Sequence, residues 1–390
     1  MYNYPPLPRI LHITNAGGFG RIQRGGGERA VEELSAAFSA VDGWTAGVCA
    51  PAEFLVTAKI SPNVRQYPVE LEDFSIGRAI RPGGKIESII AEYRPNVVIT
   101  HLLRGTIVGL PVARKNSSAA TISILHNSLR DAVKYSDQSS FRRIANLSMF
   151  RLVGRLASAH VAISPSNRID LVRYDRMPRH RVHTINNWVS TEFTEFDCTG
   201  RTMSGTVKRL MIVGRLEEQK NHGFIIKRIL PRLPSTVVLD IVGEGALEDC
   251  LKRDVDRLGL GDRVFFHGLR RDIPALMSSA DVVLVPSLFE GFGRVAVEAM
   301  SVGTRVLASD VPGLRDVCRS APPNSVSLIG VEDDLEWERA IRSFLTSEVS
   351  ESQRQDLRLF AAHNFSLSAS VGKYAELVED LLANSPGRSM

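Results

Sequence analysis

Short runs of β-branched and aliphatic residues alternate along the chain with longer stretches that carry apolar residues at helical spacing. Such runs, bounded by Gly, Pro, Asn or Asp, predict strands that are buried on both faces of a sheet. In the first half they predict strands at residues 9–14, 45–49, 64–67, 97–100, 121–125, 160–163 and 182–185. In the second half they predict strands at residues 209–213, 237–242, 264–266, 282–285, 305–308 and 326–328. Helical periodicity predicts helices at residues 28–40, 85–93, 105–114 and 141–157, and others between the strands of the second half.

This alternation of strand and helix occurs twice and predicts two domains. Strands joined through helices at this spacing form parallel sheets covered on both faces, so each half predicts a doubly wound α/β domain. The length of 390 residues suits two domains that each bury a core. We expect the boundary near residues 190–206, where the sequence is polar, rich in Thr and Ser, and without apolar periodicity.

The composition is that of a globular protein without a membrane span. Hydrophobic residues make up 44% of the chain and charged residues 23%. No apolar run approaches membrane-spanning length, and the N-terminus lacks a signal-peptide pattern. Cys49, Cys198, Cys250 and Cys318 are scattered, which favours reduced thiols and a cytoplasmic location, and no Cys/His cluster has zinc-site spacing.

The net charge of +5 is concentrated in the first half. Residues 1–200 hold 24 Lys and Arg against 17 Asp and Glu, whereas residues 201–390 hold 24 against 26. The basic half predicts an acidic partner, either anionic lipid headgroups or a phosphorylated acceptor. We expect no nucleic-acid partner.

The most informative chemical pattern lies at residues 287–300, just after the predicted strand at 282–285. Gly291, Phe292 and Gly293 form a turn at the start of a helix, where backbone N–H groups and the positive helix end favour a phosphate. Glu290 precedes this turn and Glu298 follows it, so two carboxylates suited to hydroxyl groups flank the expected anion. The pattern predicts a nucleotide-sugar site; the alternative is an ordinary α/β turn with solvated glutamates.

Two cations and further glycines follow other strands of the second half. Arg215 and Lys220 come after the strand at 209–213, and open α/β sheets bind ligands at the carboxyl ends of their strands. Two cations there are suited to hold a leaving diphosphate and to stabilise the charge that develops as a glycosidic bond breaks. Gly243 opens another turn after the strand at 237–242. The alternative for Arg215 and Lys220 is a solvated pair in a loop.

Together these segments resemble the retaining glycosyltransferases of family 4, which have the GT-B fold. The resemblance covers about residues 205–385 and is carried by GRLEEQKN (214–221), VGEG (242–245), residues 272–300 and SDVPGLRDV (309–317). It implies an α/β protein with two doubly wound Rossmann-like domains facing a central cleft. Residues 1–195, joined by a C-terminal helix at 366–386, would bind the acceptor, and residues 205–365 would bind the nucleotide sugar.

The resemblance also implies roles for individual residues. Arg215 and Lys220 would bind the donor diphosphate, Glu290 the hydroxyls of the donor sugar, and Glu298 the ribose hydroxyls. The turns that contain Gly243, Gly291, Phe292 and Gly293 would complete the donor site. The chain departs from the family pattern at Arg294, where an aliphatic residue is usual, and at Asp316, where Glu is common. We interpret Arg294 as a solvated helix residue; the alternative is that it reaches a phosphate or the acceptor.

The first half resembles the family more loosely. Gly26 and Gly27 look like part of the family's glycine loop, which faces the donor phosphates. They also fit a dinucleotide fingerprint, but about ten residues separate them from their strand, so a Rossmann oxidoreductase is the weaker alternative. His126 corresponds to a histidine that contacts the reacting sugar and shapes the acceptor site, and His101 has a similar setting at another strand end. The alternative for His126 is a structural loop histidine.

Residues 141–157 predict a basic amphipathic helix. We expect Phe141, Ile144, Leu147, Phe150 and Leu156 on one face, with Arg142, Arg143, Arg151 and Arg155 around the rest. Such a helix suits an anionic membrane surface, where lipid-linked acceptors reside; the alternative is a core-packing helix with a solvated basic face.

The sequence therefore predicts a cytoplasmic, retaining glycosyltransferase, with peripheral attachment at the inner face of the membrane as one of the two alternatives for residues 141–157. It would move a sugar from a nucleoside-diphosphate sugar to a hydroxyl of a glycan or lipid-linked acceptor, as in cell-surface polysaccharide biosynthesis. We expect Glu290, His126, Arg215 and Lys220 to be catalytic, and no metal or other cofactor. The rival functions are a nucleotide-sugar epimerase on the same fold and a non-catalytic scaffold.

Overall fold

The structure of the protein, a computed structural model, describes residues 7–15, 25–69, 83–129, 140–198 and 205–384. The chain divides into an N-terminal unit, Met1–Asn186 with Ser368–Met390, and a C-terminal unit, Asn187–Leu367. The sequence placed this boundary near residues 190–206. In the structure, Val189 donates its N–H to the Phe365 carbonyl and Arg294 bonds to Ser190, so the polar stretch begins inside the C-terminal unit.

The N-terminal unit is built on a parallel sheet. Its strands are β1 (Arg9–Thr14), β2 (Thr45–Ala50), β3 (Arg65–Pro68), β4 (Val97–His101), β5 (Ala120–Leu125), β6 (Ala159–Ala162) and β7 (Val182–Thr184). Among the described residues they pair in the order β3-β2-β1-β4-β5-β6-β7, each pair parallel. The strand order reverses between β1 and β4, so the carboxyl ends of these two strands form the topological switch point.

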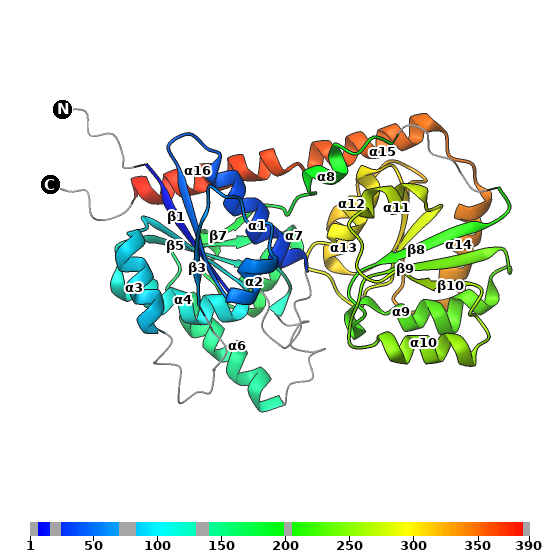
Figure 1. Cartoon of the computed structure of the whole chain (residues 1–390), viewed down its shortest axis with the longest axis horizontal. Helices are drawn as coiled ribbons and strands as arrows, with labels where there is room; N and C mark the ends of the chain where they lie inside the picture. Colours follow the sequence, from blue (N-terminus) through cyan, green and yellow to red (C-terminus); the bar gives the residue numbers. More distant parts are fainter. Residues whose placement is uncertain (1–6, 16–24, 70–82, 130–139, 199–204, 385–390) are drawn as a thin grey trace. The chain divides into compact units, whose positions relative to one another are not determined.

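Helices cover both faces of this sheet (Figure 1). They are α1 (Gly26–Ser39), α2 (Ala52–Thr57), α3 (Gly83–Tyr93), α4 (Leu102–Asn116), α6 (Ser140–Gly154), α7 (Pro165–Ile169), η1 (Asp170–Tyr174), η2 (Arg179–Arg181) and α16 (Leu367–Ala383). A buried cluster joins Leu11 and Ile13 of β1 to Ile86 and Ile90 of α3. The strands therefore carry near-continuous apolar sequence because both faces of the sheet are buried.

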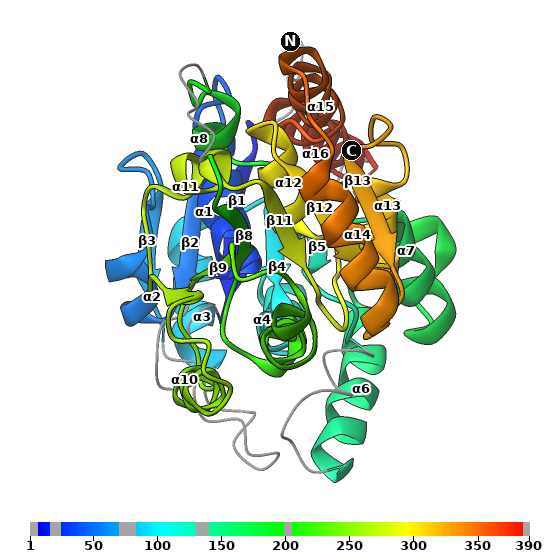
Figure 2. The same ribbon diagram turned by 90° about the vertical axis from the view of Figure 1, so that its right-hand side faces the viewer.

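The C-terminal unit repeats this architecture. Its strands are β8 (Lys208–Val213), β9 (Val237–Val242), β10 (Val264–Phe266), β11 (Val282–Val285), β12 (Arg305–Ser309) and β13 (Val326–Ile329). Over the described residues their order is β10-β9-β8-β11-β12-β13, again all parallel, and Figure 2 shows β9, β8, β11, β12 and β13 following one another across the view. The switch point lies between β8 and β11.

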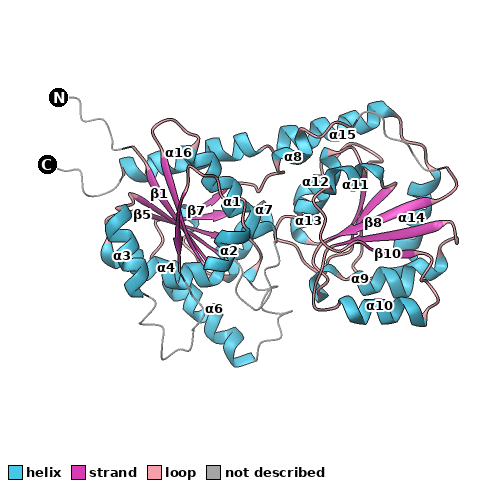
Figure 3. Cartoon of the chain, viewed as in Figure 1, coloured by secondary structure: helices cyan, strands magenta, loops and turns pink. Residues whose placement is uncertain are grey.

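Helices and shorter helical turns precede, connect and follow the strands of this unit (Figure 3). They are α8 (Thr191–Thr194), η3 (Glu218–Lys220), α9 (His222–Phe224), η4 (Ile225–Ile229), η5 (Leu230–Arg232), α10 (Glu248–Arg257), α11 (Ile273–Ser279), α12 (Arg294–Ser301), α13 (Pro312–Cys318), α14 (Asp334–Thr346) and α15 (Glu351–Asn364). Two parallel sheets, each wound with helices on both faces, confirm the predicted fold class.

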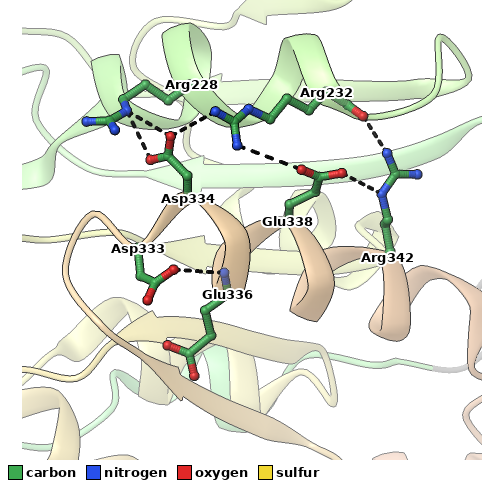
Figure 4. Close-up of polar contacts among 7 residues, drawn as sticks. All are labelled: Arg228, Arg232, Asp333, Asp334, Glu336, Glu338 and Arg342. Atoms are coloured by element: carbon green, nitrogen blue, oxygen red, sulfur yellow. Dashed lines mark hydrogen bonds and ion pairs between the residues drawn. The ribbon is translucent and has the colours of Figure 1, made fainter.

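Ion pairs fix α14 against the helical segments that follow the β8 loop (Figure 4). Arg228 and Arg232 each reach a carboxylate oxygen of Asp334 at 3.0 Å, and Arg342 donates from Nε to Glu338 at 3.0 Å. Exposed pairs of this kind contribute about 0.2–1 kcal/mol each. The larger contribution comes from Trp337, which is fully buried. These contacts hold the helical segments at residues 222–232, which follow closely after Lys220.

Candidate functional site

The loops at the switch point of the C-terminal unit bring Lys220 and Glu290 together. Lys220 Nζ lies 2.5 Å from Glu290 Oε1, although the two residues are 70 positions apart in the chain. Ser287 donates its hydroxyl to the same carboxylate oxygen at 2.9 Å. The two side chains are 16% and 9% exposed. A mostly buried ion pair thus occupies the place where open α/β sheets bind ligands.

The local sequence explains how Lys220 reaches this position. Lys220 ends the one-turn helix η3, and Asn221 follows in the left-handed conformation with φ of 53°. Asn adopts this conformation more readily than most residues, because its short polar side chain is compatible with it. Gln219 ties the loop to the next one, since its Nε2 donates to the Phe289 carbonyl at 3.0 Å.

Arg215, the second predicted cation, lies in the same loop. Its Nη1 is 3.1 Å from Glu217 Oε1, and both side chains are about one-third exposed, at 36% and 34%. Exposed pairs of this kind are weak, so Arg215 can exchange its partner for a stronger anion. The stem of Lys220 packs over Gly214, at 3.4 Å from the position that a Cβ would take there.

The loops that contain the predicted glycine turns pack backbone against backbone, which leaves no room for a side chain between them. A Cβ at Gly243, whose φ is 135°, would lie 2.1 Å from the Gly214 carbonyl oxygen. Gly214 donates its N–H to Val242, and Gly243 donates to Gly268, both at 2.9 Å. The loops after β8, β9 and β10 therefore form one continuous edge, and glycine at 243 is required by packing.

The turn before α12 has a similarly close neighbour. Gly293 precedes the helix with φ of 94°, and a Cβ at Gly313 would lie 2.3 Å from the Glu290 carbonyl oxygen. Gly291 lies between Glu290 and these residues, and it is buried. Phe292 is 3% exposed and its ring meets the Phe365 ring with centroids 5.6 Å apart, so the Phe292 side chain packs inside the unit.

Arg294 differs from its prediction as a solvated residue. Its side chain is 8% exposed, and its Nη2 donates to Ser190 Oγ at 2.7 Å. Its Nε lies 3.7 Å from Glu298 Oε1, one helical turn further along α12, and Glu298 is itself 4% exposed. The prediction that Arg294 is solvated is therefore wrong. Arg294 is buried because the buried Glu298 carboxylate requires a charged partner, which an aliphatic residue at this position does not supply.

In the N-terminal unit, the two predicted histidines are in contact. His101 ends β4 and His126 follows β5, and His101 Nδ1 lies 3.1 Å from His126 Nε2. The rings are stacked, with centroids 5.4 Å apart and an interplanar angle of 8°. Leu102 directly follows His101 with φ of 62°, a left-handed conformation that costs a non-glycine residue energy and that is common at functional sites.

Gly26 and Gly27 form the first turn of α1, whereas residues 16–24 of the predicted glycine loop lie outside the described part of the chain. A Cβ at Gly27 would lie 3.3 Å from the Cβ and Cγ atoms of His126 and 3.2 Å from Leu102. Glycine at 27 thus lets the start of α1 pack directly on His126.

A third histidine in contact with this pair was not among the site residues predicted from the sequence. His12 of β1 is fully buried, and its Nδ1 lies 2.9 Å from His101 Nε2. Burial lowers the pKa of His12 to about 3 and, with the neighbouring imidazoles, holds the pKa of His101 well below its ordinary value. The signal was present in the sequence, because a lone histidine inside an apolar strand needs a polar partner.

Helix α6 packs differently from its prediction. Leu147 and Phe150 join a buried cluster with Leu125 and Leu171. Four apolar side chains are exposed instead: Ile144 (65%), Met149 (37%), Leu152 (68%) and Leu156 (41%). At about 100° per residue Leu152 lies about 140–160° around the helix from Leu147 and Phe150, whereas Ile144 is exposed although it lies only about 60° from Leu147. Leu156 lies beyond the end of α6 at Gly154, so it is outside the predicted face. The side chains of Phe141, Arg142 and Arg143 lie outside the described residues.

The described residues contain neither a metal-type cluster nor a membrane-spanning helix. No group of three His, Cys, Asp or Glu side chains in the described ranges has the arrangement of a metal site. Across the same ranges, the helices are all too short or too polar to cross a membrane.

Two family models match the chain. The model for glycosyl transferases group 1 matches residues 202–361, and the model for glycosyltransferase family 4 matches residues 24–193. An uncharacterized glycosyltransferase of Methanocaldococcus jannaschii is 38% identical over 117 residues, which cover 29% of this chain and 30% of the relative. The chain spans between 28% and 49% of the length of the curated relatives it matches.

Solved structures match the fold over nearly the whole chain. Sucrose-phosphate synthase from Thermosynechococcus elongatus superposes with a TM-score of 0.77 at 20% identity, covering 97% of this chain and all of that one (100%). The Anabaena protein HepE, in complex with UDP and glucose, has a TM-score of 0.75 at 21% identity and covers 95% of this chain and 99% of its own. With both units matched by family models, the chain belongs to the glycosyltransferases of family 4 and has their GT-B fold.

Proposed function

We propose that the protein is a retaining glycosyltransferase that moves a sugar from a nucleoside-diphosphate sugar to a hydroxyl of a glycan or a lipid-linked acceptor. The observation that carries this proposal is the mostly buried ion pair between Lys220 and Glu290 at the switch point of the C-terminal unit. The structure of HepE, a fold relative, was solved with UDP and glucose, which supports a nucleotide-sugar donor.

The ion pair suits donor binding by an exchange of partners. A diphosphate carries more negative charge than a carboxylate, so it attracts the Lys220 ammonium and the guanidinium of Arg215, whose side chain is about one-third exposed. Glu290 then becomes available to accept hydrogen bonds from the sugar hydroxyls. The two cations and the backbone turn from Gly291 to Gly293 hold the diphosphate, and Gly243 allows the neighbouring loop to approach. Glu298, on α12, accepts hydrogen bonds from the ribose hydroxyls.

The reaction is a front-face displacement with retention of configuration. The bond between the anomeric carbon and the phosphate oxygen breaks, and the acceptor oxygen bonds to the same face of that carbon. The departing phosphate oxygen takes the proton of the acceptor hydroxyl. Lys220 and Arg215 stabilise the charge on the leaving diphosphate, and their fixed positions reduce the reorganisation that the step requires. No metal ion is required in this scheme.

The N-terminal unit binds the acceptor in this proposal. His126 contributes a hydrogen bond to a sugar hydroxyl and His101 supports it, and Gly26 and Gly27 form the adjacent turn. The exposed apolar side chains of α6 and the turn after it, together with exposed Arg155, suit a peripheral contact with an anionic membrane surface. Such a contact would give the protein access to lipid-linked acceptors of cell-surface polysaccharide synthesis from the cytoplasmic side.

Transfer assays with a panel of sugar nucleotides test the function. We expect a nucleoside diphosphate as product, a new glycoside whose anomeric configuration matches that of the donor by NMR, and loss of transfer in Lys220→Ala. Lys227→Ala is the matched control, because Lys227 also pairs with a carboxylate, Asp254 at 3.6 Å, but on a helical segment away from the strand ends. Conversion of the donor without an acceptor to a changed sugar would instead identify an epimerase, and an inverted product would refute retention.

A further inference from the structure

The two oxygens of the Glu290 carboxylate have different surroundings. Oε1 accepts a hydrogen bond from the Ser287 hydroxyl at 2.9 Å and lies 2.5 Å from Lys220 Nζ. Oε2 accepts no hydrogen bond from the described part of the chain, and it is not among the buried atoms without a partner. It therefore has contact with solvent at the carboxyl edge of the sheet. The protein holds one oxygen of this carboxylate and leaves the other accessible to a ligand.

The backbone of Glu290 is held on both sides. Gln219 bonds twice to the residues before it: the Leu288 N–H donates to the Gln219 carbonyl at 2.9 Å, and Gln219 Nε2 donates to the Phe289 carbonyl at 3.0 Å. On the other side, a Cβ at Gly313 would lie 2.3 Å from the Glu290 carbonyl oxygen, so the first turn of α13 packs directly on this backbone. An exchange of partners at Glu290 is therefore left to the side chains.

The side chains of Lys220 and Glu290 are anchored unequally. The Lys220 ammonium ends a flexible four-carbon stem, and Glu290 is its one hydrogen-bond partner in the described ranges. The Glu290 carboxylate is on a shorter stem and has a second donor, Ser287, three positions earlier in the same loop. Ser287 is 1% exposed, so its hydroxyl has no access to bulk water as an alternative partner. Lys220 is thus the partner that can leave, and Ser287 is the one that remains.

We propose that Ser287 is a positioning residue that holds the Glu290 carboxylate when Lys220 turns to the donor diphosphate. This inference rests on the proposed function, because it requires that exchange of partners. A mostly buried carboxylate that loses its cation needs another donor, since an unpaired buried charge is costly. The Ser287 hydroxyl is that donor. It keeps Oε1 in place, so that Oε2 stays accessible to the hydroxyls of the sugar.

The variant Ser287→Ala removes this donor, and its effect on nucleotide affinity depends on the charge at residue 290. In Ser287→Ala, the diphosphate has to remove the last donor from the Glu290 carboxylate. We expect the nucleoside diphosphate to bind about three- to tenfold more weakly, as for one lost hydrogen bond. In the Glu290→Gln background there is no buried charge to leave unpaired, so adding Ser287→Ala should change this affinity by less than about twofold.

Transfer should respond more strongly than binding. The value of kcat depends on the orientation of the sugar, which Glu290 sets in the proposed function, and the bond from Ser287 is made to a charged acceptor. We expect the loss of this bond to lower kcat by about ten- to 100-fold. The wild type and Ser287→Ala are compared at saturating donor, so that weaker binding does not contribute to the difference.

Calorimetric titration with UDP, GDP and ADP measures nucleotide affinity in the wild type, the two single variants and the double variant. Ser301→Ala is the matched control, because Ser301 is a buried serine of the same unit, 4% exposed, whose hydroxyl donates to the Val297 carbonyl at 2.8 Å. The control should change neither nucleotide affinity nor kcat. Circular dichroism of each variant shows whether it is folded.

An equal loss of affinity from Ser287→Ala in both backgrounds would show a merely structural role and overturn the proposal. A wild-type kcat in Ser287→Ala would overturn it as well. Either result leaves the proposed function intact, because the variants are compared with a wild type that binds the nucleotide and transfers sugar. A wild type that binds none of these nucleotides and transfers no sugar refutes the proposed function and this inference together.

Discussion

Replacing Glu290 by Gln tests the exchange of partners proposed for Lys220. In the structure, Lys220 Nζ lies 2.5 Å from Glu290 Oε1, and the two side chains are 16% and 9% exposed. A diphosphate that binds Lys220 has to compete with this carboxylate. Gln keeps the shape of the side chain and its carbonyl oxygen but removes the charge. The variant should therefore bind the nucleoside diphosphate more tightly while losing the group that holds the sugar.

The size of the effect follows from the geometry of the pair. The Coulomb attraction of two unit charges about 3 Å apart is about 5–6 kcal/mol at an effective dielectric constant of 20. Desolvation of the two mostly buried groups offsets much of it, which leaves about 1.5–3 kcal/mol for a charged hydrogen bond. If binding of the diphosphate forfeits about half of the free energy of this ion pair, Glu290→Gln should bind the nucleoside diphosphate about three- to tenfold more tightly. Transfer should fall by at least about 100-fold.

Calorimetric titration with nucleoside diphosphates measures the affinity, and turnover with the complete donor measures transfer. Asp254→Asn is the matched control, because it removes the carboxylate paired with Lys227 at 3.6 Å and should change neither quantity. Weaker nucleotide binding in Glu290→Gln would refute the exchange, because it would mean that the carboxylate supports the diphosphate site. Retained transfer would remove Glu290 from the proposed mechanism.

Three other predictions concern different parts of the chain. Gly243→Ala should destabilise the C-terminal unit by more than about 2 kcal/mol in urea unfolding, since its Cβ would lie 2.1 Å from a backbone oxygen, whereas Gly261→Ala, with open space around it, should be neutral. Burial raises the pKa of Asp175 to about 7, so the folded state binds the proton more tightly than the unfolded state. Stability should therefore fall by about 2–3 kcal/mol from pH 5 to pH 7, and Asp175→Asn should abolish that slope. Leu152→Asp should weaken sedimentation with anionic vesicles, while Val56→Asp, at an exposed apolar residue of α2, should not; equal effects would refute a specific contact through α6.

The elements of the fold were predictable because buried parallel strands have a local signature. The strands at residues 237–242, 264–266 and 282–285 have the same bounds in the sequence prediction and in the structure. A strand covered on both faces is a nearly continuous apolar run, so its ends are marked by the first polar or glycine residue. Helices gave larger differences at their ends: α4 begins at Leu102, three residues before the predicted start, because the left-handed Leu102 begins the turn directly after His101.

The contents of the site were predictable only in part. The residues that follow each strand were identifiable, but the order of strands in the sheet was not, and that order is what places Lys220 beside Glu290. Strand order depends on pairing between distant segments, for which a single sequence carries no local signal. The roles of the two residues remain predictions, since their contact shows that they are neighbours and not what they bind.

Arg294 shows where local reasoning fails. A basic residue on an amphipathic helix is normally solvated, and that rule led to the wrong interpretation. One of its partners was visible in the sequence, because Glu298 lies at the i+4 position on the same helix. The other, Ser190, is 104 positions away, on the segment that enters the C-terminal unit. An arginine with a partner at i+4 can be exposed or buried, and only the distant hydroxyl distinguishes the two. The buried position of Arg294 is therefore explained by Ser190 and Glu298 together.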